Sequence, residues 1–190
     1  MITLPLEIFK QEVVMRKLLN EELPRLSKDE FKEQAKTPVV IVLDNVRSHL
    51  NVGSIFRTAD AFLLEAIYLC GITGVPPHRD IHKSALGATE TVAWKHFSTT
   101  GEAIGELKKK NYKIISIEQA EWATMLDEFV PVKGEKYAVV FGNEVEGVNQ
   151  EIVSASDVVI EIPQYGMKHS LNIAVSVGVV IWDLVCKMKK

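Results

Sequence analysis

The chain has 190 residues, 47% of them hydrophobic, and a formal net charge of −3. This composition fits one globular domain and excludes a disordered chain. The slight acidic balance excludes nucleic-acid binding through overall basic charge, but not through a local basic face. The two cysteines, Cys70 and Cys186, each lie in an apolar run, so we expect buried thiols in a reducing cytoplasm and no disulfides.

The first part of the chain predicts a helical extension. Residues 6–24 form an amphipathic pattern that ends near Pro24, without the features of a signal peptide. Ser27 and Glu30 have the spacing of a capping box, which predicts a second, short helix to about Lys36. Because the composition changes after Pro38, we divide the chain into an extension, 1–36, and a domain, 37–190.

From residue 38 onward, apolar strands alternate with helical patterns. The predicted strands are 39–43, 66–70, 91–95, 112–117, 136–141 and 158–162, and the predicted helices are 52–62, 80–86, 100–110, 149–155 and 170–187. Residues 119–135 have no regular pattern. Nearly all-apolar strands that alternate with helices predict an α/β fold with a mostly parallel sheet covered on both faces. Ligands in such folds bind beyond the carboxyl ends of the strands, so loops 44–51, 71–80, 118–135, 142–148 and 163–170 are the candidate site.

The first candidate segment leads into the helix at 52–62. We expect Asn51 to be the N-cap of this helix. Arg57 lies off the apolar face of the helix. It is either a solvated side chain paired with Asp60 or an arginine that binds phosphate with its planar fork.

The second candidate segment, residues 141–147, follows a buried strand and turns on two glycines. Glu144 is expected to face the ligand crevice more directly than Glu146, although an ordinary acidic turn has the same pattern.

The third candidate segment runs from Ile160 into the last helix. The strand stops at Pro163, a turn follows at Gly166, and Ser170 and Asn172 stand at the start of a helix that is apolar on nearly every side. The two side chains either cap the helix or line a site. The helix itself belongs to the core, to a subunit interface, or to both.

Several common motifs are missing from the sequence. It contains no dinucleotide fingerprint, P-loop or nucleophile elbow. His78 and His82 are four residues apart, but no third ligand accompanies them, so we expect exposed loop histidines and no metal. No apolar run approaches the roughly 20 residues of a membrane span, and we expect no membrane partner.

Together the three segments resemble the motifs of the SpoU (TrmH-type) branch of the SPOUT RNA methyltransferases. The resemblance covers roughly residues 38–187. It rests on N51-V-G-S-I-F-R57 with Ala59, on V140-F-G-N-E144 with Gly147, and on Ile162-Pro163, Gly166 and S170-L-N172, in that order, with the loop K83-S-A-L-G-A88 between the first two. Gln164 and Leu63 depart from the usual pattern.

The resemblance implies a fold, a cofactor and a reaction. The fold would be an α/β domain with a deep trefoil knot at its C-terminal end, dimeric through helices of the knot region. The cofactor would be S-adenosylmethionine. The reaction would transfer a methyl group to a ribose 2′-hydroxyl of tRNA or rRNA in the cytoplasm, with tRNA slightly favoured.

The resemblance also assigns roles to residues. The catalytic set falls on Arg57, Asn51, Glu144, Ser170 and Asn172, and cofactor contacts made largely by the backbone fall on Ile117, Gly142, Ile162 and Leu171. Candidates for a basic RNA-binding face are Arg47, Arg79, Lys83, Lys95 and Lys168. Three alternatives remain open: an inactive RNA-binding or assembly factor of the same fold, an enzyme that methylates a base, and a flavodoxin-like or other small-molecule binder.

Overall fold

The computed structural model describes residues 15–24, 26–167 and 170–189 of the chain. The strands are β1 (Thr37–Asp44), β2 (Leu64–Cys70), β3 (Trp94–Phe97), β4 (Tyr112–Ile117), β5 (Thr124–Met125), β6 (Lys136–Phe141) and β7 (Val158–Glu161). The α-helices are α1 (Lys28–Glu33), α2 (His49–Ala61), α3 (Arg79–Ala85), α4 (Thr100–Lys109), α5 (Gln150–Ala155) and α6 (Ile173–Met188), with short 3₁₀ turns at Asn20–Glu22 and Ala88–Glu90.

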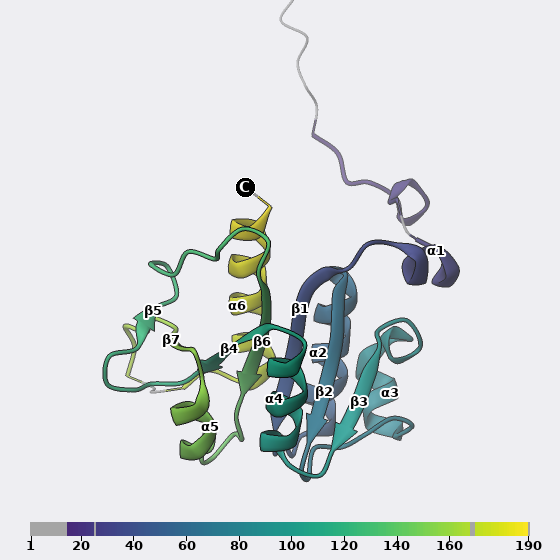
Figure 1. The fold of residues 1–190 in the computed structure, drawn as a ribbon. Helices are drawn as coiled ribbons and strands as arrows, with labels where there is room; N and C mark the ends of the chain where they lie inside the picture. The colour runs from purple at the N-terminus through teal and green to yellow at the C-terminus, as the bar shows by residue number, and fades with distance from the viewer. Residues whose placement is uncertain (1–14, 25, 168–169, 190) are drawn as a thin grey trace, which may run out of the picture.

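Within these described residues, the strands form one seven-stranded sheet in the order β3-β2-β1-β6-β4-β7-β5. Every pair of neighbouring strands runs parallel. Helices cover both faces of the sheet (Figure 1). The predicted fold class, α/β with a parallel sheet, is therefore confirmed.

Two hydrophobic cores lie on opposite faces of the sheet. Successive strand residues point to opposite faces, so Ile41 and Leu43 of β1 join the core under α2, α3 and α6, while Val40 and Val42 join the core under α4 and α5. All four side chains are essentially excluded from solvent. Burial on both faces explains why the central strands are almost continuously apolar.

Four strands differ in detail from the sequence prediction. Strand β1 spans 37–44 rather than 39–43, and β2 begins at Leu64 rather than at residue 66. The strand predicted at 91–95 begins at Trp94, and β7 ends at Glu161 rather than Ile162. The short β5 was not predicted, because it forms by pairing with β7 through Thr124 and Ile160, a contact that no local pattern encodes. The predicted bounds of β4 and β6 are confirmed.

Helix α2 begins earlier than its apolar pattern suggested. Ser48 is the N-cap, and its hydroxyl accepts a hydrogen bond from the Asn51 backbone N–H at 3.3 Å. The assignment of Asn51 as N-cap was therefore wrong, and the Asn51 side chain is free for other contacts. The helix ends at Ala61, and Leu63 follows with a φ of 51°, the left-handed conformation that commonly ends helices.

The N-terminal prediction is only partly confirmed. The capping box of Ser27 and Glu30 is present and opens α1, which ends at Glu33. The helix predicted at 6–24 lies outside the described residues over 1–14, and over 15–24 it is wrong, because only a 3₁₀ turn forms there. Leu18 and Leu19 in this stretch are mostly exposed, so its apolar side has no core to pack against.

The C-terminal part of the fold brings loops together at one end of the sheet. Helix α6 starts at Ile173, three residues later than predicted, with Asn172 as its N-cap.

No helix among the described residues is long and apolar enough to cross a membrane. Cys70 is fully buried, which raises the pKa of its thiol to about 12, whereas Cys186 is only half-buried. The trefoil knot stays a prediction.

Candidate functional site

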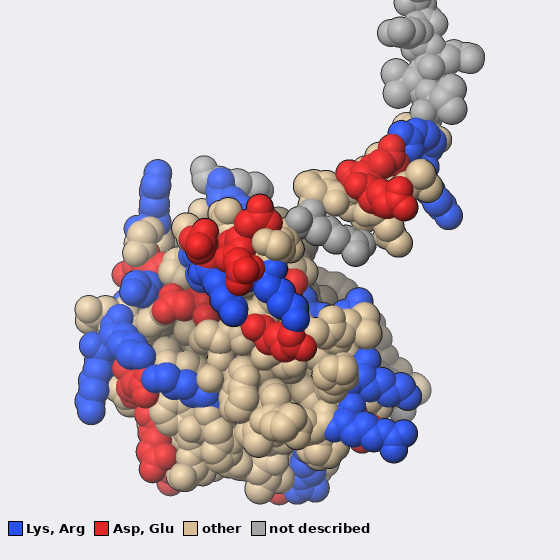
Figure 2. Space-filling model, turned by 90° about the vertical axis from the view of Figure 1, so that its right-hand side faces the viewer, with Lys and Arg blue, Asp and Glu red and all other residues tan. Residues whose placement is uncertain are grey.

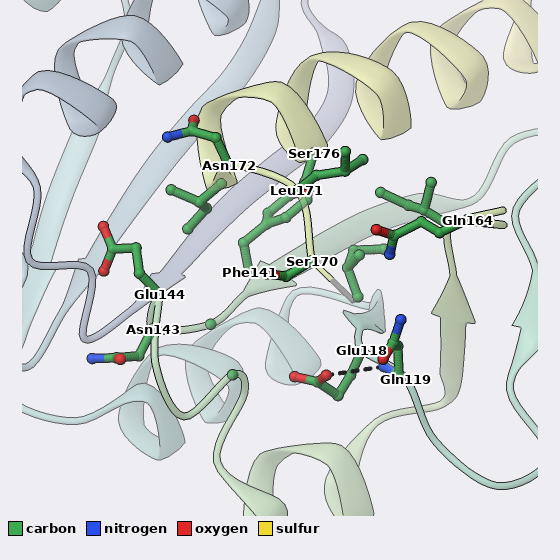
Figure 3. A pocket seen from close by; sticks show the side chains of 15 residues that line it. Glu118, Gln119, Phe141, Asn143, Glu144, Gln164, Ser170, Leu171, Asn172 and Ser176 are labelled. Carbon is green, nitrogen blue, oxygen red and sulfur yellow. Dashed lines mark hydrogen bonds between the residues drawn. The ribbon is translucent and has the colours of Figure 1, made fainter. Parts of the chain in front are cut away.

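A pocket of about 380 Å³ opens at the carboxyl end of the sheet. It lies where β4, β6 and β7 end, which is the edge of the sheet where the sequence predicted a ligand site. Figure 3 shows Glu118 and Gln119 on one side of it and Ser170, Leu171 and Asn172 on the other. The pocket is large enough for a small-molecule ligand, since such sites measure roughly 300–1,000 Å³.

The turn after β6 forms one wall of this pocket. Asn143 and Gly147 exchange two backbone hydrogen bonds of 3.0 Å, which fold the turn back on itself. A Cβ atom on Gly142 would lie 2.0 Å from the carbonyl carbon of Gly147, a distance that no side chain tolerates. Residue 142 must therefore be glycine for the turn to close.

Glu144 on this turn is the centre of a polar cluster at the pocket rim. Its carboxylate accepts hydrogen bonds from the backbone N–H groups of Arg47 and Ser48, at 3.2 and 3.3 Å. It also accepts one from the side-chain amide of Asn51, at 3.3 Å. Burial acts to raise the pKa of Glu144, but its own backbone N–H and these donors outweigh it, so the pKa is lowered and the carboxylate stays ionised.

Asn172 joins the same cluster from the third candidate segment. Its side-chain N–H donates to Oδ1 of Asn51 at 3.3 Å, while its own Oδ1 accepts from the Ala174 backbone N–H at 2.9 Å. Asn172 therefore caps α6 and also contacts the site. Three segments that are far apart in the sequence meet in this chain of contacts.

The residues assigned to the cofactor by resemblance also come together. Ile117, Gly142, Ile162 and Leu171 all line the same pocket, as do Glu144, Ser170 and Asn172. Apolar side chains, a tightly turned backbone and a few polar groups suit a ligand that has a flat apolar part and polar ends. The residues present therefore fit a nucleoside-type cofactor.

Arg57 does not line this pocket. It lies six residues beyond Asn51 on α2 and borders a separate groove with Lys28, Asp60 and Leu86. The alternative that Arg57 pairs with Asp60 is wrong within the described chain, where Asp60 instead accepts a hydrogen bond of 2.6 Å from Thr91. The Arg57 guanidinium has no partner among the described residues.

The sequence interpretation missed other polar residues of the pocket. Glu118, Gln119, Gln164 and Ser176 all contribute to its lining. Glu118 and Gln119 directly follow an apolar strand, which is a readable signal for a position at the ligand edge. Ser176 had no such signal, because it lies within an apolar helix.

The prediction of exposed loop histidines is only partly confirmed, because His82 is exposed but lies within α3, and His78 is half-buried. His78 caps α3 through its ring nitrogen, and its ring stacks on that of His49 with centroids 3.8 Å apart. Among the residues described, no three His, Cys, Asp or Glu side chains are grouped so that they could hold a metal ion.

A parallel α/β sheet whose end loops enclose a pocket beside an amide–carboxylate cluster defines an α/β protein with a candidate ligand site. Comparison with known families agrees, because the model of the SpoU rRNA Methylase family matches residues 38–182. The chain belongs to this family.

Two named methyltransferases are similar to the chain in sequence. It is 27% identical over 153 residues to the 23S rRNA (guanosine-2′-O-)-methyltransferase RlmB of Neisseria meningitidis, covering 80% of this chain and 60% of that protein. It is 29% identical over 171 residues to the tRNA (guanosine(18)-2′-O)-methyltransferase of Aquifex aeolicus, covering 87% and 76%. The chain thus spans less than two thirds of the length of the first relative.

Solved structures share the fold. The TrmH/SpoU tRNA modifying enzyme of A. aeolicus matches with a TM-score of 0.74 at 24% identity, over 85% of this chain and 80% of that one. The AdoMet-bound rRNA methyltransferase of Sinorhizobium meliloti matches with a TM-score of 0.72 at 24% identity, over 84% and 60%.

Proposed function

We propose that this protein is an RNA methyltransferase that transfers a methyl group from S-adenosylmethionine to a ribose 2′-hydroxyl of tRNA or rRNA. The observation that carries the proposal is the convergence of Ile117, Gly142, Ile162 and Leu171 on one pocket beside the Glu144 cluster. Relatives named as guanosine-2′-O-methyltransferases of tRNA and of rRNA support it. The tRNA enzyme aligns over more of its own length, which favours tRNA slightly.

The pocket residues hold the cofactor and set its orientation. The cofactor, when bound, supplies an electrophilic methyl group on a sulfonium. The apolar side chains of Ile117, Ile162 and Leu171 all line the pocket and reduce its contact with water. The closed turn at Gly142 presents backbone to the ligand, so positioning supplies much of the acceleration.

The rim cluster orients the acceptor. Glu144 fixes the backbone of residues 47–48 and the amide of Asn51, and Asn51 in turn accepts from Asn172. Ser170 stands at the pocket with an exposed hydroxyl that can donate to a ribose oxygen. These groups hold a hydroxyl in line with the methyl group.

Arg57 orients the RNA. A guanidinium remains protonated throughout the accessible pH range, so Arg57 serves as a phosphate and hydroxyl ligand rather than as the base. Its unpartnered side chain on the surface of α2 suits a phosphate supplied by the substrate.

Basic residues near the carboxyl end of the sheet supply RNA affinity. Arg47, Arg79 and Lys83 are exposed on the loop before α2 and on α3. Lys95 is less suitable because it pairs with Glu106 at 2.8 Å, and Lys168 lies outside the described residues. Figure 2 shows basic side chains at both margins of one face, with acidic side chains among them on the left and in the upper middle and uncharged surface in the lower middle. RNA binding should weaken steeply with salt.

The protein forms a homodimer through α6. On this helix Val175, Val179 and Trp182 are 51%, 39% and 59% exposed, and their spacing places them along one face. Together with Leu171 they form an apolar strip that a second copy would cover.

Residues 37–190 form the catalytic domain, and residues 1–36 form an extension that touches RNA or covers the dimer. The protein works in the cytoplasm.

The reaction is tested with RNA from cells that lack the gene. Purified protein and methyl-labelled S-adenosylmethionine should restore one ribose methylation, mapped as a site resistant to alkaline cleavage. Label recovered on a base would contradict the ribose assignment. Tight cofactor binding without transfer to any RNA would point to an inactive RNA-binding factor, and no cofactor binding would point to another kind of small-molecule binder.

A further inference from the structure

Glu118 is a carboxylate in the pocket for which the motifs assign no role. It follows Ile117 directly at the end of β4 and lines the pocket beside Gln119. The side chain is half-buried. Within the described chain no lysine or arginine pairs with it, so its negative charge is not neutralised by the protein.

The surrounding backbone holds this carboxylate in place. One oxygen, Oε2, accepts a hydrogen bond from the Val148 backbone N–H at 2.8 Å. The other, Oε1, accepts from the Gln119 backbone N–H at 2.9 Å. Two segments of the chain therefore fix the carboxylate before any ligand arrives.

The neighbouring turn is shaped around the same group. Gly147 has a φ of 72°, and a Cβ atom there would lie 2.2 Å from Oε2 of Glu118. The second glycine of the turn thus leaves room for the carboxylate at the pocket wall.

The carboxylate retains capacity for further hydrogen bonds. An ionised carboxylate can accept about four hydrogen bonds, and the protein supplies only two. A ligand that offers two adjacent donors would fill the remaining positions. The vicinal hydroxyls of a ribose are such a pair of donors, and an acidic residue at a strand end is a general means of holding them.

The opposite side of the pocket suits another part of the ligand. Leu171 lies across the pocket from Glu118 (Figure 3) and offers apolar surface for a flat base. Ile117 and Ile162 add apolar surface elsewhere in the lining. The Glu144–Asn51–Asn172 cluster occupies the rim, where the acceptor must enter. The corner at Glu118 is thus left for the sugar.

We propose that Glu118 accepts hydrogen bonds from the 2′- and 3′-hydroxyls of the cofactor's ribose and so positions the nucleoside in the pocket. This assignment rests on the proposed function, because it takes S-adenosylmethionine as the ligand. Glu118 is a positioning residue, and no proton is transferred.

The test measures how much the two hydroxyls matter with and without the carboxylate. Affinities of S-adenosylhomocysteine and its 2′,3′-dideoxy analogue are determined by calorimetry for the native protein and for Glu118→Gln. Removing the hydroxyls should weaken binding to the native protein by roughly tenfold or more, since hydrogen bonds to a charged group are lost. The same removal should cost Glu118→Gln less than about threefold.

Comparing two ligands on one protein separates this role from a structural one. If Glu118 only ties the turn to β4, Glu118→Gln binds both ligands more weakly by the same factor. Removing the hydroxyls then weakens binding as much as in the native protein, and this result overturns the assignment. If Glu118 instead attracts the sulfonium charge, the affinity ratio of S-adenosylmethionine to S-adenosylhomocysteine changes while the hydroxyl penalty does not, which also overturns it.

Glu146→Gln is the matched control, because Glu146 is an exposed carboxylate on the same turn but does not line this pocket. Removing the two hydroxyls of the ligand should weaken its binding to Glu146→Gln by the same factor as its binding to the native protein. If the native protein binds neither nucleoside, the proposed function fails and this assignment fails with it. If the native protein binds both and the penalties of native and Glu118→Gln are equal, only this assignment fails.

Discussion

Asn51 and Arg57 are carried by the same helix, α2, but have opposite surroundings. Asn51 is tied to Glu144 and Asn172 at the pocket rim, whereas Arg57 borders a groove with Asp60 and has no partner among the described residues. Six residues advance a helix by roughly 9 Å and turn it to another face. One part of the site is therefore completed by the chain itself, and the other is left for the substrate or for a second copy.

Substitution of Arg57 should have the largest effect on the rate of methylation if Arg57 contacts only the substrate. Arg57→Ala should lower single-turnover methylation by about 10²–10³, the usual cost of losing one charged transition-state contact, while the cofactor affinity measured by calorimetry stays unchanged. Arg57→Lys should recover only part of the rate, since it keeps the charge but loses the fork.

Lys109→Ala, which removes an exposed charge on α4, is the control for Arg57 and should leave the rate unchanged. If Arg57→Lys retained nearly the native rate at saturating RNA, the guanidinium would not be required. The difference between the surroundings of Asn51 and Arg57 on α2 would then have no bearing on catalysis.

Gly142 tests whether the chain alone builds the pocket. In Gly142→Ala the new methyl group would overlap the backbone of Gly147, so we expect a stability loss of about 1–3 kcal/mol. Cofactor affinity should fall by at least about tenfold, equivalent to 1.4 kcal/mol. Urea unfolding and calorimetry measure the two effects.

Gly105→Ala in α4 is the matched control for Gly142, because a Cβ there meets no atom within 4 Å. This substitution should stabilise the protein by about 0.5–1 kcal/mol, since alanine is the better helix former. Unchanged cofactor binding by Gly142→Ala would show that the turn can open without loss of the pocket.

Asn172 allows its two contacts to be separated. Asn172→Ala removes both the cap of α6 and the contact with Asn51, and it should cost about 1 kcal/mol of stability as well as activity. Asn172→Asp keeps a good cap but loses the donor to Asn51, so stability should be nearly native while turnover falls. Equal turnover in Asn172→Asp and native protein would reduce Asn172 to a helix cap.

Glu144 should give the smallest effect on stability. Because its carboxylate is partly exposed, solvent screens its contacts, and we expect Glu144→Gln to cost less than about 1 kcal/mol at pH 7. The folded-state pKa lies below the unfolded value. The stabilising contribution is therefore present above the unfolded pKa and is lost as the pH falls through the folded pKa.

Urea unfolding of native protein and Glu144→Gln from pH 7 into the acid range measures this contribution. The two stabilities should converge as the pH falls. Glu146→Gln, on the same turn, should differ little from native protein at every pH. A Glu144→Gln difference that did not change with pH would show that the lost contacts do not depend on the charge.

The sequence alone determined the layers of the fold and most of the pocket. Continuous apolar runs such as 137–141 indicate strands buried on both faces, and their ends mark where Gly142 and Glu144 lie. The resemblance to the SpoU family then implied that Ile117, Ile162 and Leu171 contact one cofactor, and all three line one pocket.

Only the tertiary structure decided the contacts between distant segments. The pairing of β5 with β7, the hydrogen bond from Asn172 to Asn51, and the closing of the 142–147 turn around Glu118 depend on which loops meet at the end of the sheet. Local propensity cannot encode such contacts, because each partner alone could equally be a cap, a turn residue or a solvated side chain. The same reason explains why Ser48 caps α2, while the side chain of Asn51 contacts Glu144 and Asn172.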